Sequence, residues 1–572
     1  MRILFLLLIL VVFTSGSISN SVDKPYPKDY FSAPVKTTIR LSGTFGELRS
    51  NHFHMGIDIK GSIGVPLYAA AEGHVVRIKV QAASYGKVLY IAHPAGYTTV
   101  YAHMNRFTDE LEDYVKQIQY EQEQFEVDLY PKPGQFSFER GERIGAMGTT
   151  GYSFGPHLHF EIRDSKTEKP INPLLFNFRV EDTVSPRMHQ IKTYELDKKR
   201  RTLDSRVYDL QGQGKSYRIS GDTIYASSNQ VGLALKAYDH MNNIRNWNGL
   251  YVAELWVDDQ LHYNYKMESI SFDDTRYLNA HLDYGDQVSL KSYFNRLFAL
   301  PGNGLDIYPD QIEAGIISLK TGRAARKIQM IAKDAAGNTT TLRFWLKRSN
   351  RETKGSAPDH QYLLGYDQAH EILTESLKVY IPKGALYEDL FMHYSWADRE
   401  QPAIYSAIHH VHDYKTPVHK YIDIAIQPGT IPDYLRPKAF IAYIDQDGDI
   451  VNYGGVWEDG MLKAKVRDLG DFCIMVDEER PKIIPGYFKS NLKGASRMTF
   501  KMMDNYGTSG NTRRVQYRAT VDGQWILMEY DAKNDLLFHR FDGRIPPGNH
   551  QLRIEVWDSR NNVAVLERAF SL

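Results

Sequence analysis

The chain has 572 residues, and its 69 basic and 69 acidic side chains give a formal net charge of zero at pH 7. A chain of this length is too long for one hydrophobic core, so several domains are expected. The balanced charge argues against the basic surface of a nucleic-acid-binding protein and against an acidic disordered tail, so no nucleic-acid partner is expected.

The first residues predict a secretory signal peptide over residues 1–19. An early arginine precedes an apolar run from Ile3 to Phe13, and small residues follow at Ser17 and Ser19. The run is short for a membrane span, which favours cleavage after Ser19 over a retained anchor. No later segment is long and apolar enough to span a membrane, so the pattern predicts export across the inner membrane to the periplasm or cell envelope.

Residues 36–175 predict a β-rich domain, because short alternating or apolar runs such as "KVLYIAHPAG" are separated by turns that contain glycine. The segment 107–138 departs from this pattern, since apolar side chains recur there near helical spacing. These are Leu111, Tyr114, Val115, Ile118 and Phe125. We expect an inserted amphipathic helix that either limits access to a neighbouring groove or packs as a decoration on the side of the domain.

The stretch "HFHMGID", residues 52–58, is the first candidate metal site. Its histidines and aspartate are zinc ligands by type, but an exposed turn can carry the same residues. A catalytic zinc site also needs a third protein ligand and an open position. The missing ligand must therefore come from elsewhere in the chain.

Two later strands supply further imidazoles. In "GPHLHFEI", residues 155–162, alternation along a strand places His157 and His159 on one face. In "TVYAHM", His103 stands at a strand end. Glu161 shares the face of the first two histidines, where it either orients a ligand imidazole or is a solvated acid.

These motifs, in this order, resemble the lysostaphin/LytM-like zinc metalloendopeptidases of peptidoglycan. "HMGID" matches the family's His-x-Gly-x-Asp, "YAHM" its Tyr-Ala-His, and "GTTGYSFGPHLHFE" its glycine-rich turn leading to His-x-His. The resemblance covers about residues 36–175, roughly a quarter of the chain.

The resemblance implies a Zn2+ ion bound by His54, Asp58 and His159, with His103 and His157 as catalytic histidines beside it. Two imidazoles and one carboxylate leave one position of a tetrahedral zinc ion for water, which is the arrangement of a catalytic site. Either catalytic histidine suits the general base, and the sequence leaves this choice open. The implied substrates are the peptide stems of peptidoglycan.

The rest of the chain predicts immunoglobulin-like β-sandwich modules over residues 180–347, 362–478 and 481–572. One pattern recurs at "LALKAYDHMNN", "IQMIAKDAAGNTTTLRFWL" and "LRIEVWDSRNNVAVLERAF": an alternating strand, an aspartate and a turn with asparagine. Residues 348–361 are polar, contain glycine and proline, and predict a linker. The only cysteine, Cys473, leaves no disulfide framework, and its strand-like surroundings predict a buried, unreactive thiol.

These expectations describe an all-β, multidomain protein with a β-sheet metallopeptidase core, a helical insertion and immunoglobulin-like modules. The predicted function is hydrolysis of peptide cross-links of bacterial peptidoglycan by a secreted zinc metalloendopeptidase. One alternative is an envelope binding or adhesion protein whose C-terminal modules bind an envelope protein partner. The other is a non-catalytic regulator of other wall hydrolases on the same fold. Such a regulator loses ligands, whereas all five predicted site residues are present here.

Overall fold

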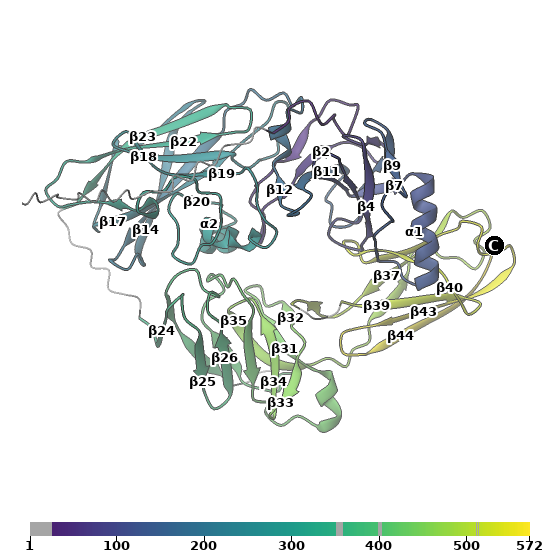
Figure 1. Ribbon diagram of the computed structural model, residues 1–572. Helices are drawn as coiled ribbons and strands as arrows, with labels where there is room; N and C mark the ends of the chain where they lie inside the picture. The colour runs from purple at the N-terminus through teal and green to yellow at the C-terminus, as the bar shows by residue number, and fades with distance from the viewer. Residues whose placement is uncertain (1–25, 350–358, 399–402, 511, 513) are drawn as a thin grey trace, which may run out of the picture.

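The computed structural model describes residues 26–349, 359–398, 403–510, 512 and 514–572 (Figure 1). The predicted signal peptide lies outside these residues, as does most of the predicted linker. Strands dominate the described residues, which confirms the all-β prediction. None of the helices in the described part is both long and apolar enough to cross a membrane.

The first unit, residues 26–178, contains one large sheet and one small sheet. The large sheet has the order β1 (Leu41–Gly43), β2 (Ile57–Lys60), β11 (His157–Asp164), β6 (Tyr97–Ala102), β5 (Lys87–Ala92), β4 (Gly73–Val80) and β8 (Val127–Leu129), with β12 (Pro170–Ile171) on β11 and β9 (Ser137–Phe138) on β4. The small sheet pairs β3 (Pro66–Tyr68), β10 (Arg143–Met147) and β7 (Met104–Phe107). Tyr101, Phe107 and Phe160 are fully buried in the core of this unit, which ends with η1 (Pro173–Phe176).

The predicted insertion forms the helix α1 (Asp109–Gln122) and returns through β8 and β9, which both pair with β4. Acidic side chains occupy its first turn, where they interact favourably with the helix dipole. Leu111 and Val115 are buried in the core of the first unit. Phe125 lies beyond the end of the helix, so the helix is shorter than the apolar spacing indicates.

The second unit, residues 180–348, has eleven strands in one hydrogen-bonded array. Their order is β19 (Gln260–Lys266), β18 (Val252–Val257), β22 (Arg326–Lys333), β23 (Thr339–Arg348), β15 (Ser216–Ile219), β14 (Thr202–Gln213), β13 (Arg187–Leu196), β17 (Gln230–Tyr238) and β20 (Asn295–Arg296), with β16 (Thr223–Ala226) on β23 and β21 (Ile317–Ser318) on β17. Its connections contain η2 (Thr275–Tyr277), α2 (Leu278–His281), α3 (Tyr284–Leu290) and η3 (Glu313–Gly315). Side chains from β18 and β22 share one core with those from β13 and β17.

A loop of the first unit completes the core of the second. Phe45, Phe53 and Met55 belong to the same buried cluster as the side chains of β18 and β22. The backbone N–H of Phe53 donates to Oγ1 of Thr275 at 2.9 Å, and its ring centroid lies 5.8 Å from that of His281. The segment between β1 and β2 is therefore held by the second unit. The predicted domain boundaries stay a prediction, since this core crosses the first of them.

The third unit, residues 359–476, has two larger sheets that contribute side chains to one core. One runs β25 (His370–Leu373), β26 (Leu377–Ile381), β30 (Ile422–Ile426), β34 (Met461–Val466) and β33 (Val456–Glu458); the other runs β28 (Tyr394–Ala397), β29 (Ile408–Val411), β35 (Gly470–Val476), β31 (Ala439–Ile444), β32 (Ile450–Asn452) and β38 (Gly507–Thr508). A separate pair joins β24 (Tyr362–Leu364) to β27 (Leu390–Met392), and η4 (Asp433–Lys438) precedes β31. Cys473 on β35 is fully buried, as predicted, and burial raises the pKa of its thiol to about 12.

The fourth unit, residues 482–572, again places two sheets around one core. The first has the order β36 (Lys482–Pro485), β37 (Arg497–Met503), β42 (Leu536–Arg540) and β41 (Glu529–Asp531); the second has the order β40 (Gln524–Trp525), β39 (Gln516–Val521), β43 (Asn549–Trp557) and β44 (Val563–Ser571). The strand β38 leaves this unit to pair with β32 of the third.

The chain turns back on itself, so the fourth unit lies beside α1 of the first (Figure 1). Lys116 Nζ lies 3.1 Å from Oδ2 of Asp542, and the ring centroids of Tyr120 and Trp525 are 5.1 Å apart. The exposed face of the insertion is therefore a contact surface for the C-terminal unit.

Candidate metal centre

Strand β11 lies at the centre of the site, between β2 and β6. Its register places His159 directly opposite Asp58 on β2. His157 begins β11, two residues earlier, and projects to the same side as His159. His54 lies in the loop that precedes β2, and His103 directly follows β6. All five residues predicted from the sequence are thus brought together at neighbouring strand ends.

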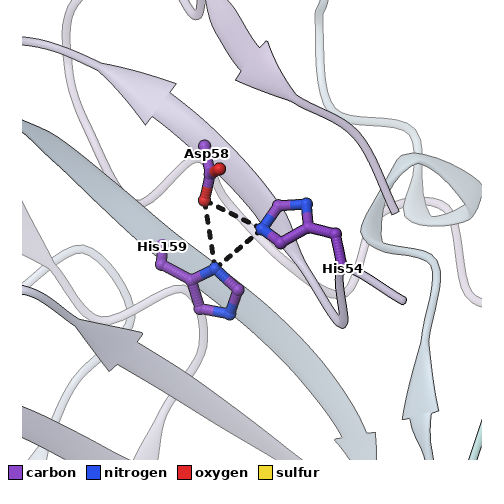
Figure 2. Close-up of side chains that lie close together, drawn as sticks. All are labelled: His54, Asp58 and His159. Carbon is purple, nitrogen blue, oxygen red and sulfur yellow. Dashed lines mark hydrogen bonds and ion pairs between the residues drawn. The ribbon is translucent and has the colours of Figure 1, made fainter. Parts of the chain in front are cut away.

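Donor atoms of His54, Asp58 and His159 converge on one another (Figure 2). His54 Nε2 lies 3.0 Å from Asp58 Oδ1 and 2.9 Å from His159 Nδ1, and His159 Nδ1 lies 3.0 Å from the same carboxylate oxygen. All three side chains are buried. Two imidazole nitrogens and one carboxylate oxygen are donor types of a tetrahedral metal site with an open position, so these residues fit a metal ion of the zinc type.

Backbone carbonyl groups set the tautomers of three histidines. The Nδ1–H of His54 donates to Thr44 O, that of His103 to Thr150 O, and that of His157 to Gly155 O, each at 2.8 Å. Because the protons reside on Nδ1, the Nε2 atoms carry the lone pairs. His54 therefore offers a ligand nitrogen, and the other two histidines offer proton acceptors.

His103 and His157 lie side by side at the edge of the donor triangle. Their ring centroids are 4.7 Å apart, and Nε2 of His157 is 3.5 Å from Oδ1 of Asp58. His103 has a φ of 58°, a left-handed conformation that is uncommon for residues other than glycine. This turn aims its ring back toward β11 instead of continuing β6.

The glycine-rich turn before His157 passes closely over the connection between β4 and β5. Gly151 has a φ of 71°, and a Cβ atom there would lie 2.3 Å from the backbone nitrogen of Gly86. Only glycine permits this approach. Thr150, whose carbonyl oxygen accepts the hydrogen bond from Nδ1–H of His103, is thereby placed next to the site.

Glu161 orients His159. The Nε2–H of His159 donates to Oε1 of Glu161 at 2.9 Å, which leaves Nδ1 as the nitrogen that faces Asp58. The other carboxylate oxygen accepts from Nε of Arg163 at 2.6 Å. Glu161 is fully buried, so of the two expectations for this residue the orienting one agrees with the structure and the solvated one does not.

Burial and hydrogen bonds shift the pKa values of the acids and imidazoles in the site. Burial alone would raise the pKa of Asp58, but its contacts with His54 and His159 hold it well below its usual value. Burial alone would lower the pKa of His159, whereas its hydrogen bonds to Asp58 and Glu161 raise it to about 9. Burial, and then the neighbouring His157, lowers the pKa of His103 to about 3, so this imidazole stays neutral near pH 7.

Tyr85 is a site residue that the sequence did not reveal. Its hydroxyl donates to Oε1 of Glu161, and its ring stacks on that of His159 with centroids 5.1 Å apart. Its backbone carbonyl accepts the N–H of His103 at 2.9 Å. It stands in an ordinary turn before β5, and nothing in the local pattern separates it from the other tyrosines.

Comparison with known families agrees with the position of this site. The model of "Peptidase family M23" matches residues 52–120 and 130–173, with the gap inside the insertion. That of "Zu5-like domain" matches residues 361–477 in the third unit.

Individual relatives match about a quarter of the chain. The DD-carboxypeptidase/endopeptidase Mpg of Neisseria meningitidis serogroup B is 32% identical over 140 residues, 24% of this chain and 26% of the relative. The peptidoglycan DD-endopeptidase ShyA of Vibrio cholerae is 28% identical over 157 residues, 26% of this chain and 30% of the relative. A crystal structure of a zinc-containing peptidase from Vibrio cholerae is 25% identical, covers 27% of this chain and 41% of that one, and has a TM-score of 0.20.

The match thus spans less than a third of the length of these two curated relatives. The match to the family model includes every residue of the donor triangle and both neighbouring histidines. Over residues 52–173 the chain resembles the lysostaphin-type metallopeptidases of peptidase family M23.

Proposed function

We propose that the protein is an exported zinc-dependent endopeptidase that hydrolyses peptide cross-links of bacterial peptidoglycan in the cell envelope. The observation that carries this proposal is the convergence of His54 Nε2, Asp58 Oδ1 and His159 Nδ1, with the imidazoles of His103 and His157 beside them. Zinc is the proposed metal because the donor set combines imidazole nitrogens with one carboxylate, whereas calcium and magnesium prefer oxygen alone.

The names of the relatives support the substrate class. Two of them are a DD-carboxypeptidase/endopeptidase and a peptidoglycan DD-endopeptidase, and the family model that matches residues 52–120 and 130–173 is that of a peptidase. We infer from this that the bond cleaved here is a peptide bond of the wall stems.

A zinc ion held by His54, Asp58 and His159 would supply Lewis-acid polarisation of the scissile carbonyl and would lower the pKa of a water molecule. Proton transfer is assigned to His103 and His157. Nδ1 of His103 and Nδ1 of His157 each lie against a backbone carbonyl oxygen, so Nε2 is the nitrogen that each ring presents to the site. A neutral imidazole at this position accepts the proton of the attacking water and returns it to the leaving amine. Glu161 keeps the ring of His159 in the tautomer that binds through Nδ1.

The test is incubation of the purified, zinc-loaded protein with peptidoglycan and mass spectrometry of the soluble fragments. Cleaved cross-linked stems are expected with the wild type and not with His159→Ala. A protein that holds zinc yet releases no fragments would favour the non-catalytic regulator. Binding of wall fragments by residues 180–572 without any hydrolysis by the full chain would favour the adhesion protein.

A further inference from the structure

Asp239 and Asp334, two aspartates of the recurring strand-and-turn pattern, form a cluster with Asp182. Asp182, Asp239 and Asp334 each place one carboxylate oxygen within 4.8 Å of the other two. Asp182 lies in the connection into the second unit, Asp239 directly follows β17, and Asp334 directly follows β22. Three separate segments therefore meet where the chain enters this unit.

Asp239 and Asp334 are buried and Asp182 is half-buried, and burial raises the pKa of all three carboxyl groups. Asp239 is 1% exposed and Asp334 is 3% exposed. Oδ1 of Asp239 is buried without a hydrogen-bond partner, on the carboxylate that faces the other two. Among the described residues, no lysine or arginine acts on the three acids as a counter-charge. Buried like charges are costly unless a cation accompanies them.

The fourth unit repeats this arrangement with different residues. Asp477 lies in the connection into that unit, Asp504 follows β37 and Asp558 follows β43, and one oxygen of each lies within 4.8 Å of the others. Oδ1 of Asp504 is also buried without a partner. The connection, first strand end and second strand end thus each contribute one acid in both units.

The hydrogen bonds around the two clusters also correspond. In the second unit, Nδ2 of Asn338 donates to Asp182 O at 3.1 Å and to Asp334 Oδ2 at 2.8 Å. In the fourth unit, Nδ2 of Asn562 donates to Asp477 O at 2.9 Å and to Asp558 Oδ2 at 2.7 Å. One difference is Arg560, which interacts with the second cluster at longer range while its Nη1 donates to Ala439 O.

The same orphaned, buried carboxylate oxygen in the same place of two units indicates a missing ligand rather than chance crowding. We propose that each cluster binds one Ca2+ ion, which ties the entering connection to the ends of two strands. The donor atoms are all oxygen, which suits a hard divalent cation, and the sites come from separate loops, which suits the flexible coordination of calcium. Zinc is disfavoured because neither cluster contains histidine.

Calcium titration of the full-length, chelator-treated protein tests the proposal by calorimetry and by thermal unfolding. The wild type should bind two Ca2+ ions per chain and unfold at a higher temperature with calcium. Asp239→Asn and Asp504→Asn should each bind one, and the double variant none. In chelator, each variant should be at least as stable as the wild type, because a like charge has been removed.

The matched control is Asp197→Asn, which alters an acid of the second unit that pairs with Arg201 and lies outside both clusters. It should bind calcium as the wild type does. Absence of saturable binding up to the millimolar concentrations typical of extracellular calcium modules would overturn the proposal. So would equal binding by wild type and double variant, or tighter binding of Mg2+ or Zn2+ than of Ca2+ at the sites that the variants remove.

Discussion

At the scale of single residues, His157 and His159 stand two positions apart on β11 but face different partners. His159 Nδ1 belongs to the donor triangle, whereas Nε2 of His157 lies at its edge. We expect His159→Ala to lose zinc and activity together. His157→Ala should keep zinc and lose about 10²–10⁴-fold in turnover, the usual contribution of a general acid–base group.

Metal analysis of the two purified variants, with hydrolysis measured on the same samples, checks this assignment. Equal loss of zinc from both would show that the roles of the pair are wrong. His52→Ala is the control, since this neighbour of the motif is exposed and should keep both properties.

Glu161 allows a second prediction, because it touches His159 and Arg163 but none of the reacting groups. Glu161→Gln weakens the acceptor that holds the imidazole, and we expect zinc affinity to fall about 10–100-fold. Glu168→Gln is the matched control, since Glu168 also pairs with Arg163 but is exposed and does not contact His159. Competition with a zinc-binding dye measures both. An unchanged affinity in Glu161→Gln would mean that packing alone orients the ring.

The sequence could predict the residues of the candidate site that alternate along one strand. The alternation of His157, His159 and Glu161 places them on one face whatever the rest of the fold does. Tyr85 and Thr44 could not be found this way. Their contributions are a stacked ring and a backbone carbonyl, and both depend on chain segments that meet only in the folded protein.

At the scale of elements, α2 carries a buried histidine that makes stability depend on pH. Burial lowers the pKa of His281 to about 4, against about 6.5 in an unfolded chain. Well above pH 6.5 the His281 ring is neutral in both the folded and the unfolded chain, so it does not change the free energy of unfolding. As the pH falls toward 4, the unfolded chain takes up a proton that the folded one refuses, so stability declines.

The expected loss from this residue between pH 7 and pH 5 is about 2 kcal/mol. Urea unfolding of the wild type and of His281→Gln at both pH values measures it, and the variant should lose about that much less. Parallel losses in the two proteins would assign the acid sensitivity to other buried histidines.

The insertion provides another element-scale prediction. Lys116→Glu combined with Tyr120→Ala replaces the ion pair with Asp542 by a repulsion and removes the ring contact with Trp525. The fourth unit should separate from α1, with a larger radius of gyration in X-ray scattering. Lys132→Glu, an exposed lysine of the same insertion, should have no effect. Hydrolysis rates of the wild type and of the double variant also test whether the insertion limits access to the groove or only decorates the domain. An insertion that limits access predicts faster cleavage after the fourth unit separates.

The helical spacing of apolar residues correctly predicted α1, because the apolar face of this helix is buried in the core of the first unit. The same spacing placed Phe125 in the helix, which is wrong because the helix ends at Gln122. Phe125 packs on the same core from the returning chain, so burial alone could not distinguish it from the helical positions.

At the scale of the whole molecule, the predicted boundary near residue 180 does not fully separate the cores of the first and second units, because side chains of the first unit are buried in the second core. Phe53 precedes His54, one of the proposed metal ligands, and is buried among residues of the second unit. A chain ending at residue 180 would expose Phe45, Phe53 and Met55, each worth about 1.5–3 kcal/mol of burial. We expect it to bind zinc weakly, whereas a chain ending at residue 349 should bind it as the full protein does.

Zinc content after dialysis against a weak chelator compares these truncated chains. Full zinc in the shorter one would mean that the first unit positions His54 unaided. The sequence could not show that the position of His54 depends on the second unit. The pattern "HFHM" indicates the types of ligand, but it does not indicate that the second unit buries Phe53.

The contact between α1 and the fourth unit joins segments that lie about 400 residues apart in one chain. Because both segments belong to one chain, closure is an intramolecular event with an effective concentration set by the chain, and dilution does not reverse it. Weak surface pairs then suffice to hold the ring of units closed, although exposed charges contribute little individually. The position of this equilibrium should respond to salt, which screens the pairs, and should not depend on the concentration of the protein.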